Sequence, residues 1–274
     1  MIREIDTGNT ESVLDETLTR GLGSLCFFHP AGTFSVTPAS DILFRAIVEK
    51  KDALHGIGID WGSGVGCQAI LAARIPAVKT VYGLEISEKN IQAAIQNAKE
   101  NKVERKVRFI LSDSYDPYCE IEKREVSALK GKVDFIVSNP PSSEGDDGFG
   151  FRRIVLNGAR EFLKRNGVVL LNVSFQYGAE RVRSLVERIP GFQHLGVAAS
   201  TQIVPFDLSR PDLLTCLKNY AKEEQNGGMK YTFYLGQNEE DGISNACRAL
   251  RDYEDSGAIP YTKWQTQMFE YIGG

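Results

Sequence analysis

The fold is decided by residues 56–75, which read GIGIDWGSGVGCQAILAARI. GIGID is a short apolar strand, WGSGVG is a glycine turn, and CQAILAARI has the apolar spacing of a helix. Glycines at 62, 64 and 66 let the backbone turn tightly and approach a ligand without a Cβ clash. A strand, a glycine turn and a helix in this order predict the first unit of a doubly wound α/β sheet, with a ligand site where the strand ends.

A carboxylate follows at the end of the next apolar segment, VYGLEI (81–86). Glu85 lies about 20 residues past the glycines, where a carboxylate accepts hydrogen bonds from the two hydroxyls of a ribose. The alternative is a solvated glutamate that opens the next helix. Asp60 precedes the glycines, and Cys67 stands where a dinucleotide fingerprint has its third glycine. This spacing favours an adenosine-containing cofactor without a pyrophosphate.

Strand and helix patterns alternate from about residue 40 onward, which is typical of a parallel sheet with crossover helices. The expected strands lie at 56–60, 81–86, 106–113, 133–139, 168–175, 192–200 and 230–237. The expected helices lie at 41–50, 67–75, 87–102, 151–167, 178–191, from Pro211, 240–254 and 261–272. One seven-stranded sheet with additions at both ends fits this pattern better than two domains.

The chain therefore divides into a lead-in segment (1–36), a sheet domain (37–237) and a helical C-terminal extension (238–274). Residues 201–228 are an insertion near the strand ends, which either shapes access to the site or covers an edge of the sheet. The C-terminal helices either pack back on the sheet or form a contact between copies of the chain.

Composition excludes several classes of protein. The 274 residues carry a formal net charge of −4, with 42% hydrophobic and 25% charged residues, as in ordinary globular proteins. No apolar run approaches the roughly 18 residues of a membrane span, and the polar N-terminus is not a secretory signal. The five cysteines are scattered, so we expect no metal site, no disulfide framework and a cytoplasmic protein. Residues 102–108 (KVERKVR) and Arg152–Arg153 are local basic segments, for nucleic acid or merely solvated.

The strand VDFIVS (133–138) ends in Asn139, Pro140 and Pro141. Prolines commonly stop strands, which is one interpretation. The other is a rigid set of acceptors for an amino group, because proline fixes φ and with it the direction of the neighbouring carbonyl.

Taken together, the motifs resemble those of the class I S-adenosylmethionine-dependent methyltransferases. IDWGSGVG looks like their first motif, GLEI the acidic end of their second strand, LSDSYDP their adenine-contacting loop, and SNPPS the fourth motif of the amino-methylating branch. The resemblance covers roughly residues 37–237. It implies a Rossmann-like, mostly parallel seven-stranded sheet whose last strand is antiparallel, and S-adenosyl-L-methionine as cofactor.

By this resemblance, Asp60 and the glycines would surround the methionine tail of the cofactor, Glu85 would hold the ribose and Asp113 the adenine. The full expected cofactor set is Thr37, Asp60, Gly62, Ser63, Gly64, Gly66, Glu85, Asp113, Ser114 and Asn139. The expected catalytic set is Asn139, Pro140 and Pro141. The Asn139 side-chain oxygen and the Pro140 carbonyl would accept the two hydrogens of the nitrogen and favour its pyramidal form, so that catalysis is mainly positioning.

One position departs from the family pattern, since Ser142 stands where an aromatic residue usually follows Asn-Pro-Pro. Phe149 or Phe151 would replace that ring, or Phe151 packs into the core as the next helix begins. Asp146, Asp147 and the acidic overall charge weigh against a nucleic-acid substrate.

The sequence thus predicts transfer of a methyl group to a nitrogen of a protein amide, an RNA base or a small molecule. Two other classes stay open. A nicotinamide-dependent oxidoreductase would use the same strand, glycine turn and Glu85, and a methyltransferase-like binding module would have lost catalysis.

Overall fold

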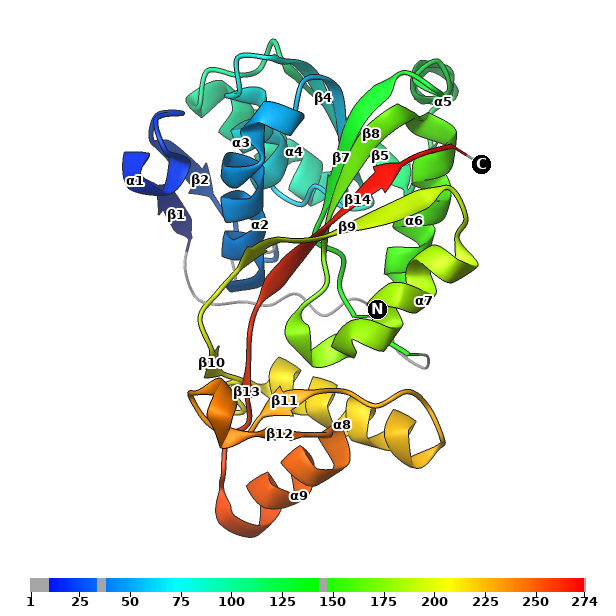
Figure 1. Cartoon of the computed structure of the whole chain (residues 1–274). Coiled ribbons are helices and arrows are strands. Elements are labelled where there is room, and N and C mark those ends of the chain that lie inside the picture. Colours follow the sequence, from blue (N-terminus) through cyan, green and yellow to red (C-terminus); the bar gives the residue numbers. More distant parts are fainter. Residues whose placement is uncertain (1–9, 34–37, 143–146, 274) are drawn as a thin grey trace.

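The computed structural model describes residues 10–33, 38–142 and 147–273. Its centre is a sheet with strand order β6-β5-β4-β3-β7-β8-β14-β9 (Figure 1). The strands are β3 (Gly56–Trp61), β4 (Val78–Glu85), β5 (Val107–Asp113), β6 (Asp116–Pro117), β7 (Val133–Ser138), β8 (Leu163–Asn172), β9 (Phe192–Ser200) and β14 (Gln265–Tyr271). Strands β5, β4, β3, β7 and β8 pair in parallel, and β14 is antiparallel to both β8 and β9. Since β6 has only two residues, seven strands form the body of the sheet, and the predicted fold class is confirmed.

The antiparallel strand comes from a different part of the chain than expected. It is β14, within the segment 261–272 that was expected to be helical. Its backbone is paired along both edges, with β8 and with β9, and this tertiary pairing outweighs the helix preference of its Gln, Met and Glu residues. The expected last strand at 230–237 forms only the two-residue β11 (Phe233–Tyr234), which lies outside the main sheet. The prediction of an all-helical extension over 238–274 is therefore wrong for its last part.

Helices cover both faces of the sheet, as a doubly wound fold requires (Figure 1). Those of one face are α2 (Pro38–Glu49), α3 (Cys67–Ala73) and α4 (Glu88–Glu100), and those of the other are α5 (Glu120–Ser127), α6 (Gly150–Phe162) and α7 (Gly178–Arg188). A buried apolar core lies on each face. Helix α6 ends before the predicted residue 167, because Leu163 already pairs with Val133 of β7.

The lead-in segment contains a hairpin, β1 (Glu11–Leu14) and β2 (Leu25–Phe28), with the short helix α1 (Glu16–Thr19) between its strands. Two asparagines of α4 and its C-terminal end hold the free edge of β2. The side-chain amide of Asn101 forms hydrogen bonds with the backbone N and O of Cys26, at 3.0 and 2.7 Å. The side-chain amide of Asn97 forms hydrogen bonds with the backbone N and O of Phe28, at 2.8 and 3.0 Å. Side-chain amides on a helix thus take the place of a neighbouring strand.

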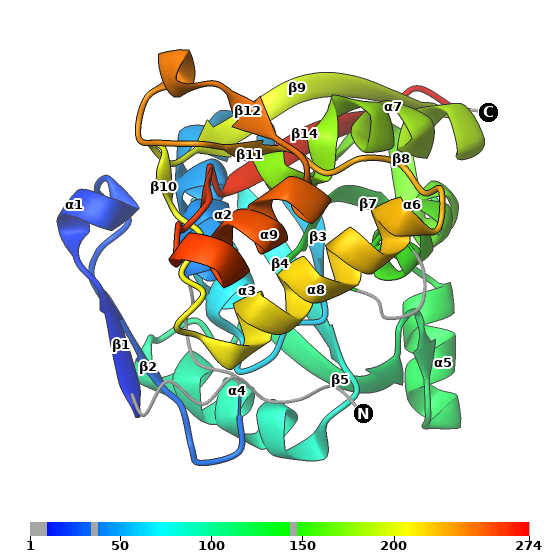
Figure 2. The ribbon, with the colours of Figure 1, turned by 90° about the horizontal axis from the view of Figure 1, so that it is seen from below.

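Residues 201–262, which we call the lobe, lie between β9 and β14. Its elements are β10 (Val204–Pro205), α8 (Pro211–Gln225), β11, β12 (Ile243–Ser244), α9 (Ala246–Ser256) and β13 (Tyr261–Thr262). It also contains a short 3-10 turn at Glu239–Asp241, and two further such turns lie outside the lobe, at Lys51–Ala53 and Phe175–Tyr177. The expected insertion at 201–228 is only its first part. The lobe lies beneath the carboxyl ends of the parallel strands, with α8 and α9 across them in Figure 2.

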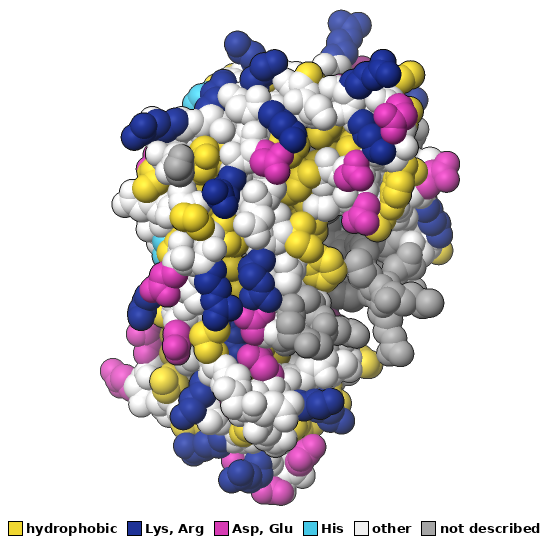
Figure 3. Space-filling model, turned by 90° about the vertical axis from the view of Figure 1, so that its right-hand side faces the viewer, with side chains coloured by type: hydrophobic (Ala, Val, Ile, Leu, Met, Phe, Trp, Pro, Cys, Tyr) yellow, Lys and Arg dark blue, Asp and Glu magenta, His cyan; other side chains and the backbone are white. Residues whose placement is uncertain are grey.

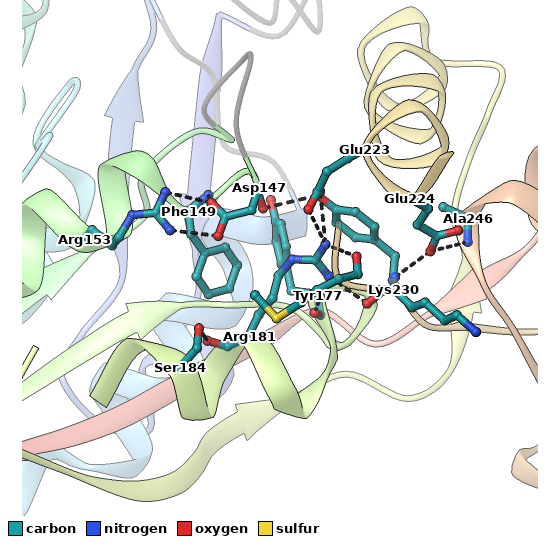
Figure 4. A network of polar contacts seen from close by, with 12 residues as sticks. Asp147, Phe149, Arg153, Tyr177, Arg181, Ser184, Glu223, Glu224, Lys230 and Ala246 are labelled. Atoms are coloured by element: carbon teal, nitrogen blue, oxygen red, sulfur yellow. Dashed lines mark hydrogen bonds and ion pairs between the residues drawn. The ribbon is translucent and has the colours of Figure 1, made fainter. Parts of the chain in front are cut away.

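A buried network ties the lobe to the sheet (Figure 4). Arg181 of α7 is fully buried and donates to both carboxylate oxygens of Glu223 of α8, at 2.9 and 3.0 Å. Its guanidinium lies 3.7 Å from the centre of the Tyr231 ring, whose hydroxyl bonds Glu223 and the Asp147 carbonyl. Burial and the hydrogen bond to Glu223 raise the pKa of Tyr231. The lobe is therefore anchored through a charged pair and not only through apolar contacts.

None of the helices in the described part of the chain is both long and apolar enough to cross a membrane.

Candidate active site

A cavity of about 370 Å³ lies between the carboxyl ends of the strands and the lobe, within the range of about 300–1,000 Å³ typical of small-molecule sites. Among the residues that line it are nine of the predicted set, namely Gly62, Ser63, Gly64, Glu85, Asp113, Ser114, Asn139, Pro140 and Pro141. Asp60 and Gly66 do not line it. Thr37 lies outside the described residues.

The glycine loop borders this cavity directly. Gly62 and Gly64 have φ of +71° and +53°, which favours glycine, and a Cβ at either position would meet no atom within 4 Å. Gly66 has a different reason to be glycine: it caps α3 with φ of +89°, and a Cβ there would lie 2.7 Å from the ring of Phe109. The first two glycines shape the site, whereas the third allows close packing behind it.

Asp60 lies behind the loop and not at the cavity surface. Its side chain is buried, and its carboxylate accepts a hydrogen bond of 2.9 Å from the backbone N of Ala69, in the first turn of α3. Burial raises the pKa of Asp60 to about 8; the bond from Ala69 opposes this rise, and the charge of Glu85 adds to it. In the structure Asp60 joins the end of β3 to the helix that follows the glycine loop.

Glu85, at the end of β4, is buried and faces the cavity, so it is not a solvated helix start. One oxygen accepts from the backbone N of Gly64 (2.8 Å), and the other accepts from the Ser87 N (2.9 Å) and the Asn90 amide (3.2 Å). A carboxylate has about four acceptor positions, so the oxygen beside Gly64 retains one for a ribose hydroxyl.

The residues present fit S-adenosylmethionine. The Ser63 hydroxyl lines the cavity, is buried, and has no hydrogen-bond partner among the described residues, which suits a site completed by a polar ligand.

Asp113 is exposed at the end of β5. The Ser114 hydroxyl accepts the Trp61 indole N–H at 2.8 Å, which fixes the indole at the cavity wall. When bound, the cofactor would be held by the loop at 62–64, Glu85 and Asp113.

Three side chains orient the Asn139 amide. The Asn172 Nδ2 donates to Asn139 Oδ1 at 2.8 Å, and Asn139 Nδ2 donates to the Ser40 hydroxyl at 3.4 Å. Asn172 is itself fixed because its Oδ1 accepts from the Thr266 hydroxyl of β14. Asn139 Oδ1 therefore remains an acceptor with one lone pair free, at the wall of the cavity.

Arg152 of α6 holds the two prolines and was not predicted as a site residue. Its guanidinium donates to the carbonyls of Asn172 (2.9 Å), Pro141 (3.3 Å) and Pro140 (3.5 Å), and it lies 4.6 Å from the Tyr177 ring. The side chain is buried, so Arg152 is neither a nucleic-acid contact nor a solvated helix end. The sequence signal that indicates burial of Arg152 is its position on the apolar face of α6.

Of the two phenylalanines considered as replacements, Phe151 lines the cavity and Phe149 does not. Phe149 is fully buried against Tyr177, with ring centres 5.0 Å apart. Phe151 is half-buried, lines the cavity along with Ser142, and lies 6.3 Å from the ring of Trp61. Phe151 also packs against the core, so both interpretations of this residue fit its position, and of the two phenylalanines only Phe151 is placed to replace the ring missing at Ser142.

The lobe forms the opposite wall of the cavity. Its lining residues are Phe206, Arg210, Asp212, Leu213, Cys216 and Tyr220. These contacts favour the interpretation in which the insertion shapes access to the site over the one in which it covers an edge of the sheet.

The local basic segments are largely paired within the chain. Arg153 binds Asp147 with two bonds of 2.7 and 2.8 Å, and Arg108 pairs with Glu122 at 3.2 Å. Lys106 donates to two backbone carbonyls at 3.1 and 3.3 Å. Basic and acidic side chains are interspersed on the face shown in Figure 3. Over the described ranges, no three His, Cys, Asp or Glu side chains are grouped as metal ligands.

Comparison with known proteins points to methyltransferases. A release factor glutamine methyltransferase of Thermodesulfovibrio yellowstonii is 22% identical over 52% of this chain and 56% of its own length. A 4-amino-L-phenylalanine/4-methylamino-L-phenylalanine methyltransferase of Streptomyces pristinaespiralis is 27% identical over 51% of this chain and 53% of its own. The chain thus matches little more than half of the length of these two relatives.

A tRNA m1G37 methyltransferase of M. jannaschii has the same fold, with a TM-score of 0.53 and 16% identity over 97% of this chain and 58% of that one. Residues 24–200 match the family described as "Methyltransferase small domain", which is more than half of the chain. The chain belongs to the methyltransferase small domain family, in the Asn-Pro-Pro branch of the class I S-adenosylmethionine-dependent methyltransferases.

Proposed function

We propose that this protein transfers a methyl group from S-adenosylmethionine to a nitrogen atom. The observation that carries the proposal is the fixed Asn139 amide, whose Oδ1 is held by Asn172 at the wall of the cavity that Glu85 and the glycine loop also line. The groups proposed to bind the acceptor and the cofactor thus line one cavity. Family membership and the relatives' activities support the same reaction.

The cofactor, when bound, supplies an electrophilic methyl group on a positive sulfur. The chain's own part is to hold the acceptor nitrogen: Asn139 Oδ1 and the Pro140 carbonyl oxygen accept hydrogen bonds from its two N–H groups. Each oxygen already takes one bond from the protein, from Asn172 and Arg152 respectively, so each has one lone pair left. Two fixed acceptors localise the nitrogen lone pair and aim it, and such positioning lowers the barrier without a strong base.

The acceptor class follows from the relatives only as a proposal. One is named for glutamine of a release factor and the other for an aromatic amine, and both nitrogens carry hydrogens that two acceptors can bind. The acceptor is accordingly an amide or exocyclic amine of a protein, an RNA or a small molecule, and the protein acts in the cytoplasm. Contact between copies through the C-terminal segment stays a prediction, with α9 as the helix available for it.

The test is incubation with methyl-labelled S-adenosylmethionine and fractionated cell extract, followed by separation of protein, RNA and small molecules. We expect label in one fraction, and we expect Asn139→Ala to lower incorporation by roughly 100-fold or more while calorimetric binding of S-adenosylhomocysteine is retained. Near-normal incorporation by this variant would refute the assigned role of Asn139.

The alternatives give different results in the same experiment. A binding module that has lost catalysis would bind S-adenosylhomocysteine but label nothing. A nicotinamide-dependent oxidoreductase would bind the nicotinamide cofactor in its place, and the same titration made with both cofactors separates the two classes.

A further inference from the structure

The cavity extends from Asn139 into the space between the sheet and the lobe. The aromatic and charged side chains that line this space indicate which kind of acceptor fits it. We infer that the acceptor is a compact aromatic amine that also carries an amino-acid zwitterion. This inference rests on the proposed transfer to nitrogen and specifies its substrate.

Aromatic side chains wall this part of the cavity. They come from separate segments of the chain and are Phe151, Tyr177, Phe206, Tyr220 and Trp264. Phe206 is fully buried and lies 5.9 Å from Trp264, and Tyr177 lies 5.8 Å from Tyr220. These rings pack against one another, and together they give the cavity an aromatic wall against which a flat apolar group can pack.

The charges at the cavity disfavour a phosphate-bearing acceptor. Its lining includes three carboxylates, of Glu85, Asp113 and Asp212, against two guanidiniums, of Arg152 and Arg210. The Arg152 guanidinium is committed to backbone carbonyls. Phosphate binding needs an excess of available positive charge, which these residues do not supply, so an RNA acceptor fits poorly.

Arg210 and Asp212 together suit a zwitterion. They bind each other with contacts of 3.2 and 2.8 Å at the start of α8, and both line the cavity. The contacts use two of the five guanidinium N–H groups and leave lone pairs on the carboxylate. Arg210 is therefore able to take a ligand carboxylate while Asp212 takes its ammonium group. A neutral pair of this kind matches a ligand with both charges better than a simple anion.

The probe that tests the inference is 4-amino-L-phenylalanine, which combines a flat ring, a ring amine and a zwitterion. Calorimetric titration uses the protein saturated with S-adenosylhomocysteine, which prevents turnover. We expect binding of this probe, and at least tenfold weaker binding of L-phenylalanine, which lacks the ring amine, and of aniline, which lacks the zwitterion. A glutamine-containing pentapeptide is titrated in parallel.

Variants separate the zwitterion contact from general damage to the lobe. Arg210→Gln is expected to weaken 4-amino-L-phenylalanine binding roughly tenfold and to leave aniline binding unchanged. The matched control is Arg248→Gln, which removes another arginine paired with an aspartate in the lobe, Asp252 at 3.5 Å, but on the exposed surface of α9. The control is expected to bind every probe as the unaltered protein does.

The outcomes distinguish the inference from the proposed function. If S-adenosylhomocysteine itself does not bind, the proposed function fails and the inference with it. If it binds but the pentapeptide is taken up in place of the aromatic amine, or if Arg210→Gln has no effect on the zwitterionic probe, only the inference is overturned.

Discussion

We expect Asn172 to be a positioning residue for the proposed methyl transfer, because its bond to Asn139 Oδ1 fixes the orientation of the Asn139 amide. An Asn172→Asp variant keeps the acceptor for the Thr266 hydroxyl but places a carboxylate oxygen where the Asn172 Nδ2 now lies, 2.8 Å from Asn139 Oδ1. Because two acceptor oxygens repel each other, the Asn139 amide then turns, so that its NH₂ group and not its oxygen faces the substrate nitrogen. We expect kcat to fall roughly 10- to 100-fold, less than for loss of a direct transition-state contact, with unchanged binding of S-adenosylhomocysteine.

The pH dependence of this variant distinguishes positioning from structural damage. As the pH falls, the new carboxyl group of Asn172→Asp takes up a proton and can again donate to Asn139 Oδ1, so the activity relative to the unaltered protein rises. Asn157→Asp, the same change on the exposed surface of α6, is the control and should not show this rise. A constant activity ratio between pH 5 and 8 would contradict the positioning role.

Asp60 makes the stability of the cofactor-free protein depend on pH. Burial raises its pKa from 3.8 to about 8, so between these values the folded chain holds a proton that the unfolded chain has lost. The contribution of this group to the free energy of unfolding therefore decreases as the pH rises from about 4 to 8. Asn at this position does not titrate and can still accept from the Ala69 N. We expect Asp60→Asn to raise the melting temperature more at pH 9 than at pH 5.

The measurement is thermal unfolding at pH 5, 7 and 9 without cofactor. Asp255→Asn, on the exposed surface of α9, provides the same chemical change without burial. A melting-temperature difference between Asp60→Asn and the unaltered protein that is the same at all three pH values would show that Asp60 is ionised in the folded chain throughout.

The hairpin of the lead-in segment is held to α4 by the side chains of Asn97 and Asn101, and these two residues differ in their other contacts. Asn101 bonds β2 and its own helix, whereas Asn97 also donates to the Val65 carbonyl of the glycine loop at 3.0 Å. We expect each alanine variant to lower the free energy of unfolding by about 1–3 kcal/mol and to speed hydrogen exchange in residues 11–28. Only Asn97→Ala should also weaken S-adenosylhomocysteine binding, which calorimetry measures. Equal binding by both variants would refute the link from hairpin to cofactor loop.

Elements with a local signal were predicted from the sequence. The strand, glycine turn and helix at 56–75 and the carboxylate at Glu85 follow from spacing alone, and the structure places them as expected. β14 was not predicted, because its sequence favours a helix and its strand form depends on two partners distant in the chain. The site shows the same division: Asn139 belongs to a short motif, whereas Asn172 and Arg152 acquire their roles from tertiary contacts.

The part of the cavity proposed to bind the acceptor, beyond Asn139, forms only when distant segments of the chain come together. Its walls come from the sheet, from α6, from the segment before α7 and from the lobe, and no local pattern indicates that these segments meet. The residues predicted to hold the cofactor follow consecutive strands, which is a local signal, and Gly62, Ser63, Gly64, Glu85, Asp113 and Ser114 of that set line the cavity. The full extent of the lobe and its contacts carry no such local signal.

The Arg181–Glu223 pair joins the lobe to the sheet and gives the last prediction. Arg181→Met removes a fully buried charge and leaves Glu223, whose side chain is 17% exposed, without its cation. Loss of one partner of a buried pair typically costs about 3–5 kcal/mol, and urea unfolding measures it. Arg248→Met, which breaks the exposed pair with Asp252, should cost less than about 1 kcal/mol.

The double variant Arg181→Met/Glu223→Gln tests whether the loss comes from the charge left behind. Removing both charges eliminates the unpaired carboxylate, while the introduced glutamine side chain keeps an acceptor for the Tyr231 hydroxyl, so we expect part of the stability to return. The lobe contributes to the lining of the cavity, whereas Glu85 and the glycine loop, the groups proposed to hold the cofactor, come from the sheet and the turn after β3. Both variants should therefore raise the acceptor KM more than the dissociation constant of S-adenosylhomocysteine. An equal effect on the two constants would mean that the pair supports the whole sheet and does not specifically hold the lobe over the site.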